Sequence, residues 1–474
     1  MITGKILKHH GWPEGRVIGV AKKAGEALMG AGLDRDAALA RLDAVRDRPG
    51  EFLADALLGD LARECLRHFA PPPARTDDAL RPAALPYRIW GREHIEDGAL
   101  AQMDAAMRLP ITAAGALMPD AHQGYGLPIG GVLATEGVVI PYAVGVDVAC
   151  LMRLSIFEVS PFVIGQRPGQ FRKALLEQTR FGLGQHWRAT ERPDHAVLDD
   201  AGWQATRLLK SLHDLAAGQL GTSGTGNHFV EWGAFEVIEP DARLGLDPGE
   251  YLALLSHSGS RGVGFQIANL YSELAQQQHP DLDPKVRHLA WLDLNSELGQ
   301  EYWVSMELAG RFASANHAVI HRKVAGAIGL KPVAGVENYH NFAWRETLPD
   351  GRDAIVHRKG ATPAGPGVLG MIPGSMGDAG YVVRGRGGAG SINSASHGAG
   401  RALSRKQAEA TITRHARDAY LRERGVTLLG GAVDESPQAY KPIEQVIAAQ
   451  ADLVEIIGRF TPRIVRMAED GGEV

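Results

Sequence analysis

The sequence has little of two features that would set its class at once, cysteine and long apolar runs. It contains 2 cysteines in 474 residues, Cys65 and Cys150, so a disulfide framework is not expected. No stretch approaches the roughly 18 uncharged apolar residues of a membrane-spanning helix, and the first residues lack the apolar core of a secretory signal. We therefore expect a cytoplasmic protein with no membrane partner.

An excess of positive charge is also missing. The 50 Lys and Arg residues stand against 55 Asp and Glu, for a formal net charge of -5. This balance excludes a protein coated in basic surface, so any contact with nucleic acid must be local. The densest cations fall in one glycine-rich region, at His357, Arg358, Lys359, Arg384, Arg386, Arg401, Arg405 and Lys406. From charge alone, a solvated face explains them equally well.

Apolar spacing divides the chain into three parts. In residues 1–75 apolar residues recur at intervals of three and four, as at Leu39, Leu42 and Val45, which predicts a small helical N-terminal segment. The run Pro71–Pro73 ends that segment, and residues 76–117 form a linker and lead-in.

Residues 118–474 are predicted to form an α+β catalytic body, rich in the chain's 58 glycines. Short strand-like runs alternate there with glycine-rich loops, at 131–135, 153–159, 252–257 and 354–357. Two long helical patterns interrupt them, at 298–328 and 443–460.

The strongest local feature is the segment VGVDVAC, in which Asp147 and Cys150 lie three apart in a glycine-rich region. A carboxylate and a thiolate together suit a divalent transition ion. His228, His257 and His340 lie in other polar or glycine-rich loops, and the five side chains would serve two ions if the thiolate bridged them. The alternative is a small buried cysteine with hydrogen-bonded structural histidines, and spacing alone does not decide between the two.

His397 lies in a different setting, the segment SHGAGR. Gly398 and Gly400 let the backbone approach a ligand closely, and Arg401 supplies a fixed positive charge. This combination suits a histidine that attacks phosphorus and forms a covalent phosphoramidate. The loops at 372–377 and 221–227 have the composition of anion-binding nests, although each could be an ordinary turn.

Other polar residues have more modest interpretations. His317 and His321 lie four apart in a helical pattern without the carboxylate of a zinc protease motif, which favours packing or hydrogen bonding. Asp120 and His122 are candidates to orient metal ligands from behind.

Together these motifs resemble the RtcB family of RNA-splicing ligases. From about Met118 to the C terminus the family's motifs occur in order: PDAHQGYGLPIGG, VGVDVAC, GTGNHFVEW, HSGSRG, YHNFA, VHRKGAT, IPGSMG, SHGAGR and DESPQAYK. The resemblance implies an RtcB-like body of mixed β-sheets with long helices. It also implies that two manganese ions share Cys150, one with Asp147 and His228 and the other with His257 and His340.

The resemblance further implies a reaction with GTP and RNA. His397 would take the guanylate from GTP and pass it to an RNA 3′-phosphate, and a 5′-hydroxyl end would then displace GMP; 2′,3′-cyclic phosphate ends would first be opened. The residues around GTP would be Asn227, His228, Phe229, Glu231, His340, Asn341, Pro373, Gly374, Ser375, Met376, His397, Gly398, Ala399, Gly400 and Tyr440. Arg261 and Arg401 are candidates for RNA contacts, in RNA repair or tRNA splicing.

The chain departs from the family pattern near its C terminus. Met467 stands where the family carries a lysine that contacts guanine, so guanine selectivity is expected to be less sharp. Arg463 and Arg466, three apart on an expected helix, are candidate substitutes. Two other functions stay open: a metal-dependent phosphodiesterase that only opens cyclic ends, and a non-catalytic RNA-binding relative.

Overall fold

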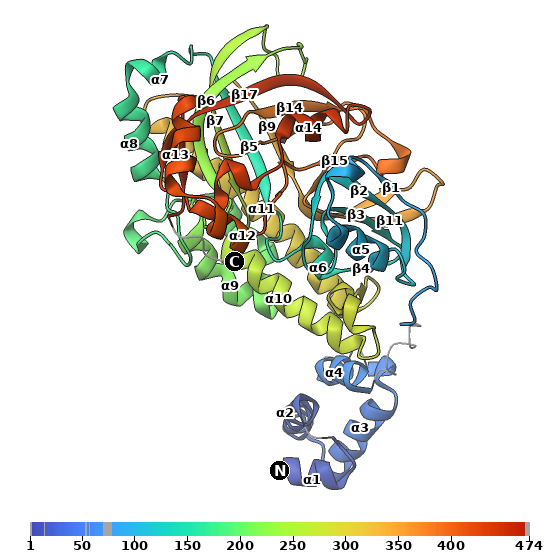
Figure 1. Cartoon of the computed structure of the whole chain (residues 1–474). Helices are drawn as coiled ribbons and strands as arrows, with labels where there is room; N and C mark the ends of the chain where they lie inside the picture. Colours follow the sequence, from blue (N-terminus) through green and yellow to red (C-terminus); the bar gives the residue numbers. More distant parts are fainter. Residues whose placement is uncertain (1, 14, 53–54, 56, 70–77, 470–474) are drawn as a thin grey trace. The chain divides into compact units, whose positions relative to one another are not determined.

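A computed structural model describes residues 2–13, 15–52, 55, 57–69 and 78–469 (Figure 1). The chain divides into two compact units, Met1–Asp77 and Asp78–Val474. The proline run Pro71–Pro73 lies outside the described residues.

The first unit is built from four described α-helices: α1 (Gly4–His9), α2 (Arg16–Gly30), α3 (Arg35–Asp47) and α4 (Gly59–Phe69). Side-chain caps start two of them, because Thr3 accepts from the amide of Ile6 and Asp34 from that of Ala37. The residues that the spacing placed on one helix face are buried in this unit's own core, at Leu39, Leu42 and Val45.

The second unit contains longer helices and many strands. Its α-helices are α5 (Asp97–Ala106), α6 (Pro141–Val144), α7 (Val163–Gln166), α8 (Pro168–Gln178), α9 (Arg207–Gln219), α10 (Arg261–Gln278), α11 (Glu297–Gly326), α12 (Arg405–Thr411), α13 (Arg414–Glu423) and α14 (Ile443–Ala448). Its strands are β1 (Arg88–Ile89), β2 (Thr112–His122), β3 (Ile129–Thr135), β4 (Val138–Val139), β5 (Leu151–Phe157), β6 (Phe229–Val237), β7 (Gly249–Ser258), β8 (Leu292–Asp293), β9 (Ala334–Tyr339), β10 (Asn341–Thr347), β11 (Asp353–Lys359), β12 (Ala361–Pro363), β13 (Leu369–Ile372), β14 (Gly380–Gly385), β15 (Ser394–Ser396), β16 (Thr427–Leu429) and β17 (Val454–Met467).

Two sheets organise this unit, and they confirm the predicted α+β class. An eight-stranded sheet runs β13-β14-β17-β6-β7-β5-β9, with β16 beside β17, and a five-stranded sheet runs β1-β2-β3-β11-β10. Helices α9, α10 and α11 gather on one side of the unit (Figure 1). The four predicted strand-like runs fall in β3, β5, β7 and β11.

One predicted long helix is confirmed and the other is wrong. The pattern at 298–328 corresponds to α11. The pattern at 443–460 instead gives the short α14, a turn and then β17, which pairs with β14 on one side and β6 on the other. An apolar run of this length fits a buried strand as well as a helix, and the hydrogen bonds offered by two neighbouring strands decide the outcome.

Helix α11 is fixed to the large sheet by buried histidines. His317 Nδ1 lies 2.6 Å and His321 Nε2 2.7 Å from the Ser256 hydroxyl. The predicted hydrogen-bonding role of this pair is therefore confirmed, and the contact holds the end of β7 in place.

Buried neutral histidines make the stability of the metal-free protein depend on pH. His357 accepts from the Ile140 amide at 2.9 Å and donates to the Leu133 carbonyl at 3.0 Å, and burial lowers its pKa to about 4. The unfolded chain takes up this proton near pH 6.5, whereas the folded chain does not. The contribution of His357 to the unfolding free energy is therefore complete above pH 6.5. It falls as the pH drops toward 4, by up to about 1.4 kcal/mol per pH unit.

Urea unfolding at pH 7, 6 and 5 measures this dependence. In His357→Gln the unfolding free energy should fall less steeply with decreasing pH, because one proton fewer is taken up on unfolding. The variant should also be less stable than the parent at pH 7. An equal pH dependence in parent and variant would contradict the assignment.

Candidate active site

The predicted metal ligands meet where the two sheets adjoin. Asp147 and Cys150 lie in the loop before β5, His228 immediately precedes β6, and His257 is near the end of β7. His340 is the single residue between β9 and β10, where the chain crosses from the large sheet to the small one. Strand pairing of β5, β6 and β7 thus brings together residues far apart in the sequence.

These residues form two groups that share Cys150, one with Asp147 and His228 and the other with His257 and His340. In the first group His228 Nε2 lies 2.9 Å from Asp147 Oδ2 and 3.5 Å from Cys150 Sγ. In the second, His257 Nε2 lies 3.1 Å from both Cys150 Sγ and His340 Nε2. The Cys150 sulfur therefore belongs to both groups, as expected of a ligand that bridges two ions.

Two of the histidines present a lone pair to this centre. His228 Nδ1 lies 2.9 Å from the Ser223 carbonyl and His257 Nδ1 3.1 Å from the Asn227 carbonyl. A carbonyl only accepts, so each Nδ1 carries the proton and each Nε2 keeps its lone pair. Both Nε2 atoms point at Cys150, which is the orientation that a metal ligand requires.

The donor set fits a divalent transition ion. Burial and, next, the Asp147 carboxylate raise the pKa of the Cys150 thiol well above its usual value, so a cation is needed to stabilise the thiolate there. Buried imidazoles and a thiolate favour transition ions over magnesium. The residues present therefore fit a metal centre.

His397 lies beside the second group, with its ring centroid 5.1 Å from that of His340. Its Nδ1 is 2.6 Å from Oδ2 of Asp120, a carboxylate that is 0% exposed. The same oxygen accepts from the amides of His397 at 3.1 Å and Gly398 at 3.3 Å. Asp120 thus fixes both the ring orientation and the tautomer, and leaves Nε2 as the free nitrogen.

The interpretation of Asp120 and His122 as orienters of metal ligands needs correction. Asp120 binds the proposed nucleophile, and His122 Nδ1 lies 3.1 Å from the backbone carbonyl of Asp120. Lys441 was not among the predicted site residues, yet its ammonium donates to the carbonyls of Pro119 and Ala121 on either side of Asp120. The motif DESPQAYK was the available signal for this lysine.

Arg261 lies against the first ligand group. Its Nη1 is 3.4 Å from His228 Nδ1, and it has a left-handed backbone with φ of 58°. In the part of the chain that the structure describes, no carboxylate forms an ion pair with it, and its Nε has no hydrogen-bond partner. A partly buried guanidinium without an ion-pair partner, in a strained backbone, is a candidate for binding an anion.

Arg401 is occupied by contacts within the protein. It donates to Glu435 at 3.3 Å and to the Asp434 carbonyl at 2.8 Å, and its guanidinium lies 5.2 Å from the Tyr440 ring centroid. These contacts account for the cation without RNA, and RNA binding by Arg401 stays a prediction.

One face of the large sheet joins the metal ligands to the predicted guanine site. Strand register places Phe229 opposite both His257 and Met467, and Glu231 opposite Val465. Directly paired residues share a face, so these side chains form one surface. Burial raises the pKa of the Glu231 carboxyl well above its usual range, and no side chain among the described residues pairs with it.

Arg466 cannot take the place that was expected of it. It pairs with Val230 on β17 and β6, which places it on the face opposite Glu231. Its guanidinium contacts the Leu429 carbonyl at 3.3 Å and lies 5.7 Å from the centroid of the Phe181 ring. The expected helix is strand β17, so the shared-face argument for Arg463 and Arg466 was wrong.

The two predicted asparagines differ in their freedom. Asn341 holds the metal loop, because its side chain donates to the Asp147 carbonyl at 3.3 Å and accepts from Gly360 at 2.8 Å. The side chain of Asn227 is exposed and its backbone carbonyl binds His257. Only Asn227 is therefore free to meet a ligand.

The predicted phosphate loop Pro373–Met376 contacts the loop after His397. A Cβ placed on Gly398 would lie 3.3 Å from the Pro373 carbonyl, and one on Gly400 would collide with Asp120. Ala399, between them, is buried. Glycines at these two positions are what allow the two loops and Asp120 to pack together.

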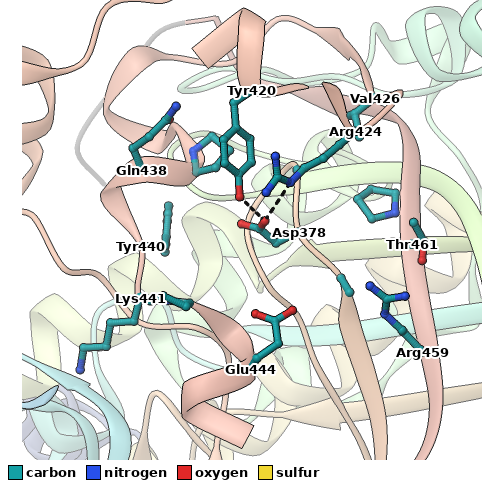
Figure 2. Close-up of a pocket in the computed structure, with 15 residues that line it drawn as sticks. Asp378, Tyr420, Arg424, Val426, Gln438, Tyr440, Lys441, Glu444, Arg459 and Thr461 are labelled. Atoms are coloured by element: carbon teal, nitrogen blue, oxygen red, sulfur yellow. Dashed lines mark hydrogen bonds and ion pairs between the residues drawn. The ribbon is translucent and has the colours of Figure 1, made fainter. Parts of the chain in front are cut away.

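The phosphate loop is tied to helix α13 at a cavity of about 510 Å³ (Figure 2). Asp378 accepts hydrogen bonds from Ser375 and, at 2.5 Å, from Tyr420 on α13. Arg424 lies 3.6 Å from the same carboxylate, and Tyr440 lines the cavity from the other side. The conformation of Ser375 thus depends on α13.

No helix in the described part of the chain combines the length and apolar character needed to cross a membrane.

Comparison with known proteins places the chain in a family. The family model described as tRNA-splicing ligase RtcB matches residues 102–218 and 199–468. The RNA-splicing ligase RtcB of Escherichia coli (strain K12) is 32% identical over 401 residues, which cover 78% of this chain and 95% of that protein. The RNA-splicing ligase RtcB of Mycobacterium tuberculosis (strain ATCC 25618 / H37Rv) is 33% identical over 416 residues, with 74% and 96% covered. The tRNA-splicing ligase RtcB of Thermococcus kodakarensis is 30% identical over 467 residues, with 79% and 94% covered. The chain therefore belongs to the RtcB family.

Proposed function

We propose that this chain is a GTP-dependent RNA ligase that joins a 3′-phosphate or 2′,3′-cyclic phosphate end to a 5′-hydroxyl end through a guanylate on His397. The observation that supports this most is the position of the His397 ring, bound through Nδ1 to buried Asp120 and 5.1 Å from the ring of His340. The names of the relatives, which are RNA-splicing and tRNA-splicing ligases, support RNA as the substrate.

Two manganese ions are the proposed cofactors. Asp147, Cys150 and His228 would hold one, and Cys150, His257 and His340 the other. When bound, such a pair neutralises the charge of the triphosphate and holds the reacting oxygens in line. The histidines of the two groups would supply lone pairs to the ions. The carbonyls of Ser223 and Asn227 keep the rings of His228 and His257 in the required orientation.

In the first step His397 Nε2 attacks the α-phosphorus of GTP. A nitrogen–phosphorus bond forms, the bond from the α-phosphorus to the bridging oxygen breaks, and pyrophosphate leaves. The attacking His397 ring acquires positive charge while its Nδ1 keeps a proton. The buried Asp120 carboxylate, 2.6 Å away, stabilises that charge before the guanylate moves on.

In the later steps an oxygen of the RNA 3′-phosphate attacks the guanylate phosphorus, the phosphorus–nitrogen bond breaks, and His397 returns as a neutral imidazole. The 5′-hydroxyl oxygen then attacks the activated 3′-phosphorus, the bond from that phosphorus to the guanylate oxygen breaks, GMP leaves and the hydroxyl proton passes to water. Arg261 offers an unpaired cation for the RNA phosphate beside His228. Cyclic ends are first opened by water.

The guanine is proposed to lie on the sheet face next to the metal ligands. Phe229 lies 5.7 Å from His257, measured between ring centroids, and supplies an apolar surface for the base. The unpaired Glu231 carboxyl suits the N–H donors of a guanine edge. The nucleotide phosphates would meet the loop from Pro373 to Met376 and the backbone from Gly398 to Gly400.

A joining assay tests this proposal. One RNA with a 2′,3′-cyclic phosphate and one with a labelled 5′-hydroxyl end are incubated with the protein, manganese and GTP. The expected result is a joined product that requires both GTP and manganese. Opening of the cyclic end without joining would favour the metal-dependent phosphodiesterase, and binding without any chemistry would favour the non-catalytic relative.

A further inference from the structure

An aromatic ring projects into solvent from a loop whose backbone is held firmly. Tyr125, between β2 and β3, is 70% exposed. The backbone of the neighbouring Gly124 exchanges two hydrogen bonds with the Gln102 side chain, of 3.0 and 2.5 Å. The Tyr125 carbonyl accepts a hydrogen bond from Lys359 Nζ at 2.5 Å. The backbone of Tyr125 is therefore fixed while its ring stays in solvent. Burial of an aromatic ring is favourable, so a ligand that covers the Tyr125 ring would be stabilised.

Two more rings continue from Tyr125. The ring of His288 lies 6.3 Å from that of Tyr125 in an edge contact, and 4.8 Å from that of Tyr142 on α6, measured between centroids. His288 is also exposed. Aromatic faces set side by side at a surface can stack successive flat groups, such as nucleobases.

Two basic side chains accompany these rings. Lys359 is 8% exposed, and it forms no ion pair with any residue that the structure describes. Burial lowers its pKa to about 7, so it is partly charged at neutral pH, and its Nζ lies 5.2 Å from the centroid of the Tyr142 ring. Arg287, exposed, adjoins His288. A phosphate beside Lys359 would favour its charged form, and a basic group without a carboxylate partner beside aromatic rings fits a phosphate attached to a base.

The same lysine connects the rings to the candidate active site. Its side chain lies against Gly145, two residues before Asp147, with a Cβ built on that glycine 3.7 Å from Lys359 Cε. The next residue, Gly360, faces the His397 ring, since a Cβ built there would lie 3.2 Å from His397 Cε1. Lys359 therefore lies next to the rings through its Nζ and, through the following residue Gly360, next to the proposed nucleophile.

We infer that Tyr125, His288 and Tyr142 form a stacking platform for unpaired nucleobases of the RNA next to the reacting end, with Lys359 binding a phosphate of the same strand. The inference rests on the proposed function for the identity of the ligand. Stacking accepts any base, so the platform selects single-stranded RNA ends without selecting their sequence. Glu231 lies on β6 of the large sheet, whereas Tyr125 lies in the loop between β2 and β3 and Tyr142 on α6, so we propose that GTP and RNA use separate aromatic surfaces.

Binding of a fluorescent single-stranded RNA with a 5′-hydroxyl end, measured by anisotropy, tests the platform. Tyr125→Ala should weaken binding about 5- to 100-fold, the range expected for one stacked base, and His288→Ala should weaken it in the same direction. Tyr125→Phe keeps the ring and should bind within about twofold of the parent. The control is Phe162→Ala, which removes a ring that is 75% exposed elsewhere on the body, and it should leave binding unchanged.

Labelling of His397 by GTP separates this inference from the proposed function. Tyr125→Ala should be labelled as fast as the parent, whereas its joining of RNA at limiting concentration should fall in parallel with binding. Unchanged RNA binding in Tyr125→Ala, or equal losses in Tyr125→Ala and Phe162→Ala, would overturn the platform. If the parent takes no label but Tyr125→Ala still binds RNA more weakly, the proposed ligase chemistry fails and the platform stands.

Discussion

Cys150→Ser should lose both metal ions and with them essentially all labelling of His397. The Cys150 sulfur belongs to both ligand groups. The serine hydroxyl that would replace it is not a soft anionic donor. The loss of activity should exceed the roughly 100- to 1,000-fold cost of deleting one stabilising donor. Metal analysis of the purified variant, with thermal unfolding to verify the fold, measures the effect.

Two further variants make this result specific. Cys65→Ser changes the other cysteine, which is buried in the N-terminal unit, and should keep both ions. His340→Ala removes a ligand of one group only and should chiefly weaken one ion. Two tightly bound ions per chain in Cys150→Ser would show that the sulfur is not the bridge.

Asp120→Asn should slow labelling of His397 about 100- to 1,000-fold, the cost of removing one group that stabilises developing charge. The asparagine carbonyl oxygen, placed where Asp120 Oδ2 lies, can still accept from His397 Nδ1 and from the two amides, so the tautomer is kept. The negative charge that stabilises the ring as it becomes positive is lost. Single-turnover label transfer measures the rate, and metal content should stay that of the parent.

His122→Gln is the matched control for Asp120→Asn, because His122 lies two residues away on β2 and its ring hydrogen-bonds to the backbone carbonyl of Asp120 and not to the carboxylate. It should label within about tenfold of the parent, as for removal of a supporting residue. A rate for Asp120→Asn within a few-fold of the parent would rule out the Asp120 charge as a contribution to the attack by His397.

The sequence predicted well those features that a local pattern specifies. The five candidate metal ligands could be named because each lies in a short motif of polar and glycine residues, and the fold brings all five together. Their division into two groups followed from the resemblance and not from spacing. Strand pairing of β5, β6 and β7 creates that proximity, and no local pattern carries it.

The failures share a physical cause, which is the choice between local and long-range partners. The stripe at 443–460 has helical spacing, yet pairing with β14 and β6 makes most of it a strand. That change reversed the side on which Arg466 lies. Asp120 was recognised as an orienter but given the wrong partner, because its contact with His397 spans 277 residues. Tyr125 lies in the motif PDAHQGYGLPIGG, but the motif did not single it out, since only the structure shows its ring to be exposed on an anchored loop.

The central claim is that His397 carries a guanylate, and labelling tests it most directly. The metal-loaded protein is incubated with manganese and GTP labelled at the α-phosphate, the labelled protein is treated with acid or base, and the labelled residue is located by peptide mapping. The account predicts label on His397 that is lost in acid and stable in base, as a phosphoramidate is, and no label in His397→Ala. Absence of label from a parent protein shown to hold two ions, or label on another residue, would contradict it.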